Sequence, residues 1–264
     1  MNVLSLFSGI GGFSLGLGRA GMRTVAFCEI EPYCRAVLRQ HWPDVPIFDD
    51  VQAIDVHEGW LVANSDARHK STEEQLQAGR TAIRTSIVDV ICGGFPCQDI
   101  SIAGKGEGIT GSRSGLWKEF ARIIGEVRPR YVIVENVAAL LGRGIADVLG
   151  DLAKIGFSSV WHCIPASAVG APHRRDRIWI VGYPMQSGLS KRTTFGERQR
   201  EATEKFSWDL TSVSSQWDVE PDVGRVAHGI PNRVDRLKAL GNAIVPQIAE
   251  IIGKAIMSHE QSIS

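Results

Sequence analysis

The sequence lacks long hydrophobic runs, a net charge and a disulfide pattern. No apolar stretch among its 264 residues reaches the length of a membrane span, so we expect no membrane association. The first residues lack the basic region of a signal peptide, and the five cysteines show no framework spacing. No Cys/His cluster has zinc-ligand spacing, so we expect no metal site. These absences predict a cytoplasmic protein.

Charge is balanced overall, with 29 basic and 29 acidic side chains, but it is distributed unevenly. Residues 170–200 carry seven Lys or Arg, whereas residues 201–224 are mainly acidic. Such a basic run is either a solvated face or a face that contacts phosphates. The hydrophobic content of 44% supports a sizeable core, and the length suits one α/β domain with or without a small appendage.

The first 29 residues have the pattern of a βαβ unit. An apolar strand at 3–7 precedes a glycine-rich turn at 8–13, a helix at 14–20 and a second strand at 24–28. Glu29 ends that second strand about twenty residues beyond the glycines, which is the position of a ribose-binding carboxylate in nucleotide folds. A tight packing turn is the alternative for the glycines. Together these features favour an adenosine-type cofactor.

Cys97 follows a predicted buried strand at 87–92 and the stiff turn Gly93-Gly94-Phe95-Pro96. The glycines allow close backbone approach, and Pro96 fixes its own φ and restricts Phe95. Most free cysteines are small buried hydrophobes, which is the alternative for Cys97. A thiol presented from such a turn at the carboxyl edge of a sheet is placed as a nucleophile would be.

Two acidic residues and two arginines are predicted at the same edge of the sheet. Asp50 follows a short strand at 46–48, where it is either an adenine ligand or a helix cap. Glu135 follows a strand at 131–134, where it either faces Cys97 or stabilises a helix start. Arg175 and Arg177 lead into a strand at 178–182, which places at least one guanidinium near the pocket.

The chain divides into three predicted parts. Residues 1–182 form the main domain, with helices at 32–41, 116–127 and 148–155 and a strand at 159–165. Residues 57–86 are polar and irregular, and we expect them to be an insertion with an exposed helix at 72–84. Residues 183–236 form a smaller appendage, and residues 237–264 a helix that opens near 238–247 and returns to the main domain.

Five motifs, in order along nearly the whole chain, resemble those of the cytosine-5 DNA methyltransferases of bacterial and phage type. They lie at residues 7–12, 94–98, 135–137, 173–177 and 241–246, with His173 where the family usually has Gln. The resemblance implies an α/β, Rossmann-like S-adenosylmethionine-dependent methyltransferase fold, with 183–236 as a small target-recognition appendage. It implies that S-adenosylmethionine is held by Phe7, Gly9, Gly11, Gly12, Glu29, Ile30, Asp50, Val51, Pro96, Leu116, Asn242 and Ala243.

The resemblance also implies the chemistry. Cys97 would attack C6 of a cytosine flipped out of double-stranded DNA, while Glu135 would hold and protonate N3. C5 would then take the methyl group, and loss of the C5 proton and of Cys97 would restore the ring. Arg175 and Arg177 would position the base carbonyl and the nearby loop. The expected partners are double-stranded DNA and a cognate restriction endonuclease, and the enzyme is expected to be a monomer on DNA.

Two alternative functions remain open from the sequence. One is an RNA cytosine-5 methyltransferase on the same fold, and the other is a catalytically silent nucleic-acid- or cofactor-binding protein. The presence of both Cys97 and Glu135 disfavours the silent alternative. Residues 183–224 are shorter than the family's usual target-recognition domain, so we predict a short or degenerate recognition sequence.

Overall fold

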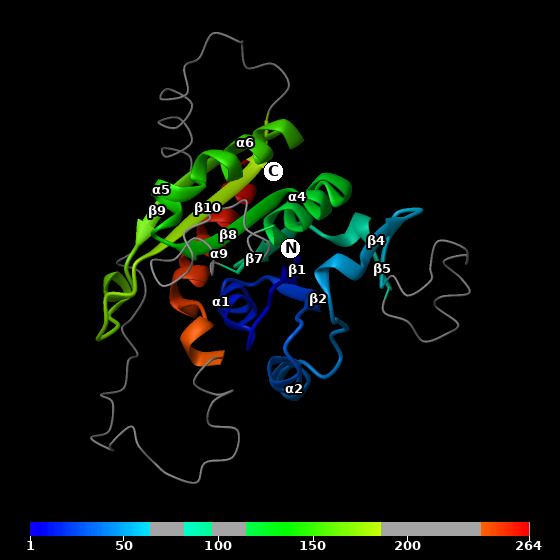
Figure 1. Ribbon diagram of the computed structural model, residues 1–264, viewed down its shortest axis with the longest axis horizontal. Helices are drawn as coiled ribbons and strands as arrows, with labels where there is room; N and C mark the ends of the chain where they lie inside the picture. The colour runs from blue at the N-terminus through cyan, green and yellow to red at the C-terminus, as the bar shows by residue number, and fades with distance from the viewer. Residues whose placement is uncertain (64–81, 97–114, 186–238, 264) are drawn as a thin grey trace.

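A seven-stranded sheet organises the computed structural model, which describes residues 1–63, 82–96, 115–185 and 239–263 (Figure 1). The strand order is β3-β2-β1-β7-β8-β10-β9. Neighbouring strands from β3 to β8 pair in parallel, whereas β10 is antiparallel to both β8 and β9. The strands are β1 (Asn2–Leu6), β2 (Arg23–Cys28), β3 (Ile47–Phe48), β7 (Val90–Gly93), β8 (Tyr131–Val137), β9 (Phe157–Ile164) and β10 (Arg177–Pro184). The predicted Rossmann-like α/β fold class is confirmed.

Helices cover both faces of this sheet, as parallel strands require. Helices α1 (Gly12–Arg19) and α9 (Pro246–Ile263) cover one face, and α4 (Leu116–Val127), α5 (Leu140–Arg143) and α6 (Ile145–Ile155) the other (Figure 1). Successive side chains of a strand point to opposite faces. In β1, Val3 therefore packs in the α1/α9 core, while Leu4 packs in the α4/α6 core.

Close packing of α1 against α9 brings the end of the chain back to its beginning. A Cβ atom on Gly16 would collide with the carbonyl oxygen of Pro246, and one on Gly253 would lie 2.7 Å from the Cβ of Ala20. The predicted C-terminal helix is present but differs in its bounds. Residues 239–242 form a helical turn, residues 243–245 are not helical, and α9 begins at Pro246 and continues to Ile263. A proline disfavours helical geometry in the residue before it, so the helix restarts there.

The sequence prediction was wrong about part of the segment 57–86. Instead of irregular chain, the structure has a small antiparallel sheet of β4 (Ile54–His57), β5 (Trp60–Ala63) and β6 (Ala82–Arg84). Glu58 and Gly59 join β4 to β5 with φ values of 49° and 78°, the two-residue turn that matches strand twist. The last three residues of the predicted helix at 72–84 form strand β6 instead, and Ile83 is buried against the α4 core. Its residues 72–81 lie outside the described residues.

Most other predicted elements are confirmed with small shifts at their ends. Helix α2 (Pro32–His41) and helix α4 have the predicted bounds. Three short 3₁₀ helices complete the described chain, η1 (Val51–Ala53), η3 (Thr85–Ile87) and η5 (Ala166–Val169). Of the predicted appendage 183–236, only 183–185 are described, and these extend or follow β10. Within the described ranges, no helix is long and apolar enough to cross a membrane.

Candidate active site

A cavity of about 270 Å³ opens at the carboxyl ends of the parallel strands β1, β2, β7 and β8. This edge of an open α/β sheet is where ligands bind. Eight residues predicted from the sequence line it, namely Phe7, Gly9, Glu29, Ile30, Pro96, Glu135, Arg177 and Asn242. They come from segments separated by more than 200 residues, and the return of the chain before α9 brings Asn242 to the strand ends.

The other predicted residues that the structure describes are not part of the lining of this cavity. Gly11 caps α1 and Gly12 begins it; a Cβ on Gly12 would lie 2.8 Å from Ile244. Val51 is buried in the core, and Leu116 begins α4. Ala243 follows Asn242 in the chain. Cys97 lies outside the described residues, although Pro96 immediately before it lines the cavity.

Glu29 is held at one end of the cavity by two backbone amides. Its Oε2 accepts a hydrogen bond from Gly9 N over 2.6 Å, and its Oε1 accepts one from Glu31 N over 2.8 Å. Gly9 has a φ of 54°, which a glycine adopts without strain. Burial raises the pKa of Glu29, while the two amides lower it. The carboxylate orientation is therefore fixed by Gly9, which belongs to the predicted glycine-rich turn, and by the backbone that follows Glu29.

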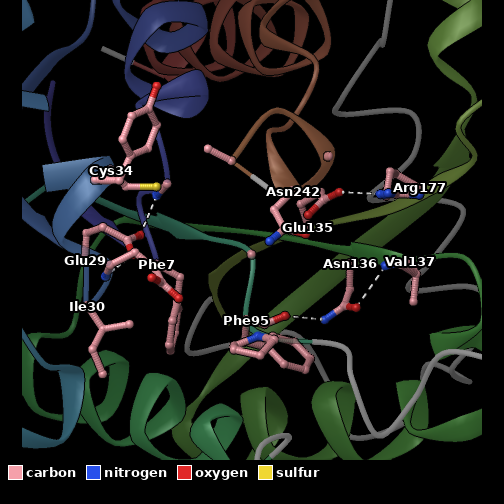
Figure 2. A pocket seen from close by; sticks show the side chains of 17 residues that line it. Phe7, Glu29, Ile30, Cys34, Phe95, Glu135, Asn136, Val137, Arg177 and Asn242 are labelled. Carbon is pink, nitrogen blue, oxygen red and sulfur yellow. Dashed lines mark hydrogen bonds and ion pairs between the residues drawn. The ribbon is translucent and has the colours of Figure 1, made fainter. Parts of the chain in front are cut away.

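Apolar side chains stand near this carboxylate. Ile30 is 63% exposed, a high value for a large apolar side chain, and lines the cavity together with Phe7 (Figure 2). The Phe7 backbone has a φ of 50°, which is uncommon outside glycine, and its ring lies 6.0 Å from that of Phe120. Backbone strain of this kind is concentrated at functional sites. Phe7 and Ile30 together offer two apolar surfaces for a flat ring.

Asp50 has the capping role that was the alternative interpretation of its sequence position. Its Oδ1 accepts a hydrogen bond from Gln52 N over 2.9 Å at the start of η1. If Asp50 also accepts a hydrogen bond from a ligand, it must do so in the orientation that this cap imposes on its side chain.

Glu135 and Arg177 form the other end of the cavity (Figure 2). Arg177 Nε lies 3.0 Å from Glu135 Oε1, and Arg177 Nη1 donates to the carbonyl of Asp176. Glu135 is only 8% exposed. Burial raises the pKa of Glu135 to about 7, against the opposing charges of Arg177 and Arg175. A carboxyl group with this pKa can both give and take a proton near neutral pH.

Two residues that the sequence analysis did not assign to the site shape this end. A Cβ on Gly94 would lie 2.7 Å from Glu135 Oε2, so the glycine makes room for the carboxylate. Asn136 is buried and donates from Nδ2 to the carbonyl of Phe95 over 3.1 Å (Figure 2). It therefore fixes the turn that leads to Cys97. The sequence carried a signal for Gly94, because close backbone approach was expected at the two glycines. It carried no separate signal for Asn136, which is the residue after Glu135.

Arg175 is not among the residues that line the cavity. Its Nη2 donates to the carbonyls of Gly241 and Ala243 over 2.7 and 2.6 Å. Its backbone has a φ of 40°, again uncommon outside glycine. Of the two predicted arginines, the structure thus brings Arg177 to Glu135 and Arg175 to the 241–243 turn.

Comparisons with known proteins agree with these features. The family model of the C-5 cytosine-specific DNA methylases matches residues 1–232. Type II methyltransferase M2.BsuMI of Bacillus subtilis is 35% identical over 189 residues, which are 69% of this chain and 41% of the relative. Type II methyltransferase M.Eco47II of Escherichia coli is 33% identical over 184 residues, or 68% of this chain and 38% of the relative. The chain thus spans less than half the length of these two relatives.

Among solved structures, the methyltransferase EhMeth of Entamoeba histolytica matches with a TM-score of 0.58. The match covers 100% of this chain and 99% of that one, at 10% identity, so it speaks for the fold alone. The family match covers most of the chain and includes the strand ends that carry Glu29 and Glu135. The chain belongs to the C-5 cytosine-specific DNA methylase family.

Proposed function

We propose that this protein is a DNA (cytosine-5)-methyltransferase that uses S-adenosylmethionine. The observation that carries the proposal is the Glu135–Arg177 pair, which shares one cavity with the Glu29 carboxylate and with the turn preceding Cys97. A buried carboxyl group of raised pKa is suited to a ring nitrogen that gains a proton during the reaction. An anchored carboxylate at the other end is suited to a ribose.

The residues at the Glu29 end fit S-adenosylmethionine. Each oxygen of Glu29 accepts one amide hydrogen bond and keeps capacity to accept a second from a ribose hydroxyl. Phe7 and Ile30 offer apolar contact to an adenine ring. Asn242 and Gly241 form another wall of the same cavity. When bound, S-adenosylmethionine supplies an electrophilic methyl group.

At the other end, the protein's own groups would act on cytosine. In its protonated form, Glu135 donates to N3 and transfers its proton as the Cys97 thiolate adds to C6, so the ring gains no net charge. Glu135 takes that proton back when the thiolate leaves. Arg177, held against Glu135, would orient the base carbonyl. The target carbon lies within the stacked duplex, so the cytosine must be flipped out.

Double-stranded DNA is the proposed substrate, in line with the family. A cognate restriction endonuclease in the same cell is a further proposal, supported by the name type II methyltransferase that both curated relatives carry. Target recognition is proposed for residues 183–236, nearly all of which lie outside the described residues.

Covalent trapping tests the proposed function. Duplex DNA with 5-fluorocytosine at its methylation sites should form a denaturation-resistant adduct in the presence of S-adenosylmethionine, because fluorine at C5 cannot leave as a proton. Cys97→Ser should form no adduct, whereas Cys163→Ser, which alters an exposed cysteine on β9, should form it normally. An adduct with RNA only would favour the RNA alternative. An adduct formed by Cys97→Ser would rule out the assigned nucleophile.

A further inference from the structure

Arg175 holds the 241–243 turn, which forms part of the cavity wall. One guanidinium nitrogen, Nη2, donates to the carbonyls on both sides of Asn242, those of Gly241 and Ala243. Gly241 and Asn242 themselves line the cavity. The position of this wall is therefore set by a side chain that comes from the loop before β10.

The charge of Arg175 also acts on Glu135. It is one of the two guanidinium groups whose positive charge lowers the pKa of Glu135, the other being Arg177. Arg175 is thus close enough to Glu135 to affect its ionisation while its donors are directed to the 241–243 turn. The same side chain thus interacts with both the 241–243 turn and the proposed base site.

The backbone at Arg175 is held in an uncommon conformation. Its φ of 40° costs free energy in any residue other than glycine, and such strain persists only where surrounding contacts enforce it. The loop is closed on its other side by a hydrogen bond from Ala166 N to Arg174 O. The two hydrogen bonds to the turn are the described side-chain contacts that hold Arg175 in this position.

We propose that Arg175 is a positioning residue for cofactor binding: it fixes the Gly241–Ala243 wall and does not itself contact the base. The inference rests on the proposed function, because it names the cofactor as the ligand of that wall. Hydrogen bonds from a charged donor are among the stronger ones in proteins. Loss of both should let the turn move and weaken cofactor affinity before it affects the chemistry at Glu135.

Binding of S-adenosylhomocysteine, measured by calorimetry without DNA, tests this role. Arg175→Met removes the donors and keeps a long side chain. Arg175→Gly also removes the donors, and glycine adopts the positive φ without strain. A loss of affinity in this variant is therefore not caused by a strained backbone. Both should bind about tenfold more weakly, the loss expected from weakening one or two charged hydrogen bonds. Arg175→Lys, which keeps charge and donors, should recover part of the affinity.

Arg174→Ala is the matched control. The Arg174 side chain, next to Arg175 in the sequence, is 83% exposed and contacts Asp176 instead of the turn. This variant should bind like the wild type. In parallel, amide hydrogen exchange in a peptide covering 239–245 should be faster in Arg175→Gly than in the wild type without any ligand. Wild-type affinity in Arg175→Gly, or unchanged exchange in that peptide, would overturn the inference. If the wild type itself binds no S-adenosylhomocysteine, the proposed cofactor fails, and the exchange comparison still decides whether Arg175 holds the turn.

Discussion

Arg177 Nε lies 3.0 Å from Oε1 of Glu135, across the antiparallel pair β8–β10. Arg177 is paired in register with Val137, so it reaches Glu135 along the diagonal of the ladder. The two side chains are 21% and 10% exposed, and little water screens them from each other. The sheet register thus places a cation beside an acid that burial would otherwise keep protonated to higher pH.

Stability should depend on pH through Glu135. Its pKa rises from 4.5 to about 7 on folding, so the folded state binds the proton more tightly. Its stabilising contribution is full below pH 4.5 and is lost as pH rises through 7. The loss is on the order of 3 kcal/mol, at 1.36 kcal/mol for each pH unit. In urea unfolding at pH 5 and pH 8, Glu135→Gln should show a smaller pH dependence than the wild type.

Glu126→Gln is the control for that measurement, since it alters a carboxylate that is 38% exposed on α4. It should keep the wild-type pH dependence. Parallel curves for the wild type and Glu135→Gln would mean that Glu135 does not take up a proton on folding.

Arg177→Met should change both the rate and its pH profile. The charge of Arg177 lowers the pKa of Glu135, so its removal should raise that pKa. If protonated Glu135 is the active form, single-turnover methylation should be slower and its decline on the alkaline side should begin at higher pH. Arg177→Lys, which keeps the charge, should leave the alkaline limb closer to its wild-type position. A shift of the limb to lower pH in Arg177→Met would contradict this assignment.

Gly94→Ala should impair the chemistry and spare cofactor binding. Its Cβ would lie 2.7 Å from Glu135 Oε2, so the carboxylate must move away from its present position. A displacement of this kind costs about 100-fold in rate at a well-positioned group. Gly150→Ala in α6 is the control, because no heavy atom lies within 4 Å of the Cβ it adds. Single-turnover rates and S-adenosylhomocysteine affinities of both variants would show whether only Gly94→Ala slows methylation.

Much of the fold could be predicted because its elements have strong local signals. Helices α2 and α4 had clear periodicity and a proline at or near a boundary, and the βαβ unit had its glycine turn. The small sheet β4-β5-β6 had no such signal. Its Glu58-Gly59 turn is not one of the commonest hairpin dipeptides, and β6 is only three residues long. Strand β6 instead depends on a tertiary contact, the packing of Ile83 in the core beside α4.

The candidate site was predictable at the level of strand ends but not of side-chain direction. Glu29 follows β2, and the sequence placed it with Glu135 at one edge, although Glu135 lies within β8, which continues to Val137 instead of stopping at residue 134. The spacing of Arg175 and Arg177 in the sequence could not distinguish their roles, because a left-handed φ at Arg175 redirects the chain between them. Asn136 was missed because its partner, the carbonyl of Phe95, is 41 residues away.

Asn136→Ala should slow adduct formation more than it weakens cofactor binding. The variant loses the hydrogen bond to Phe95 O and the one that Asn136 Oδ1 accepts from Val137 N. Leaving such buried groups without partners costs about 1–3 kcal/mol. The turn before Cys97 should then be less well fixed, which lowers the rate of trapping by 5-fluorocytosine DNA. Normal trapping kinetics in a folded Asn136→Ala variant would show that the turn needs no such support.

Glu29→Gln should have the opposite signature to Glu135→Gln. One of the two Glu29 oxygens would become an NH₂ group that faces a backbone N–H, either of Gly9 or of Glu31. The side chain would then lose its fixed orientation and the charge that accepts from the ribose, and a hydrogen bond to a charged acceptor is worth about 1.5–3 kcal/mol, so S-adenosylhomocysteine should bind at least tenfold more weakly. At saturating S-adenosylmethionine, the single-turnover rate should stay near that of the wild type, because Glu29 is at the cofactor end. Glu135→Gln should bind S-adenosylhomocysteine normally and methylate slowly at every cofactor concentration. Two variants with the same pattern would show that the cavity is not divided into a cofactor end and a base end.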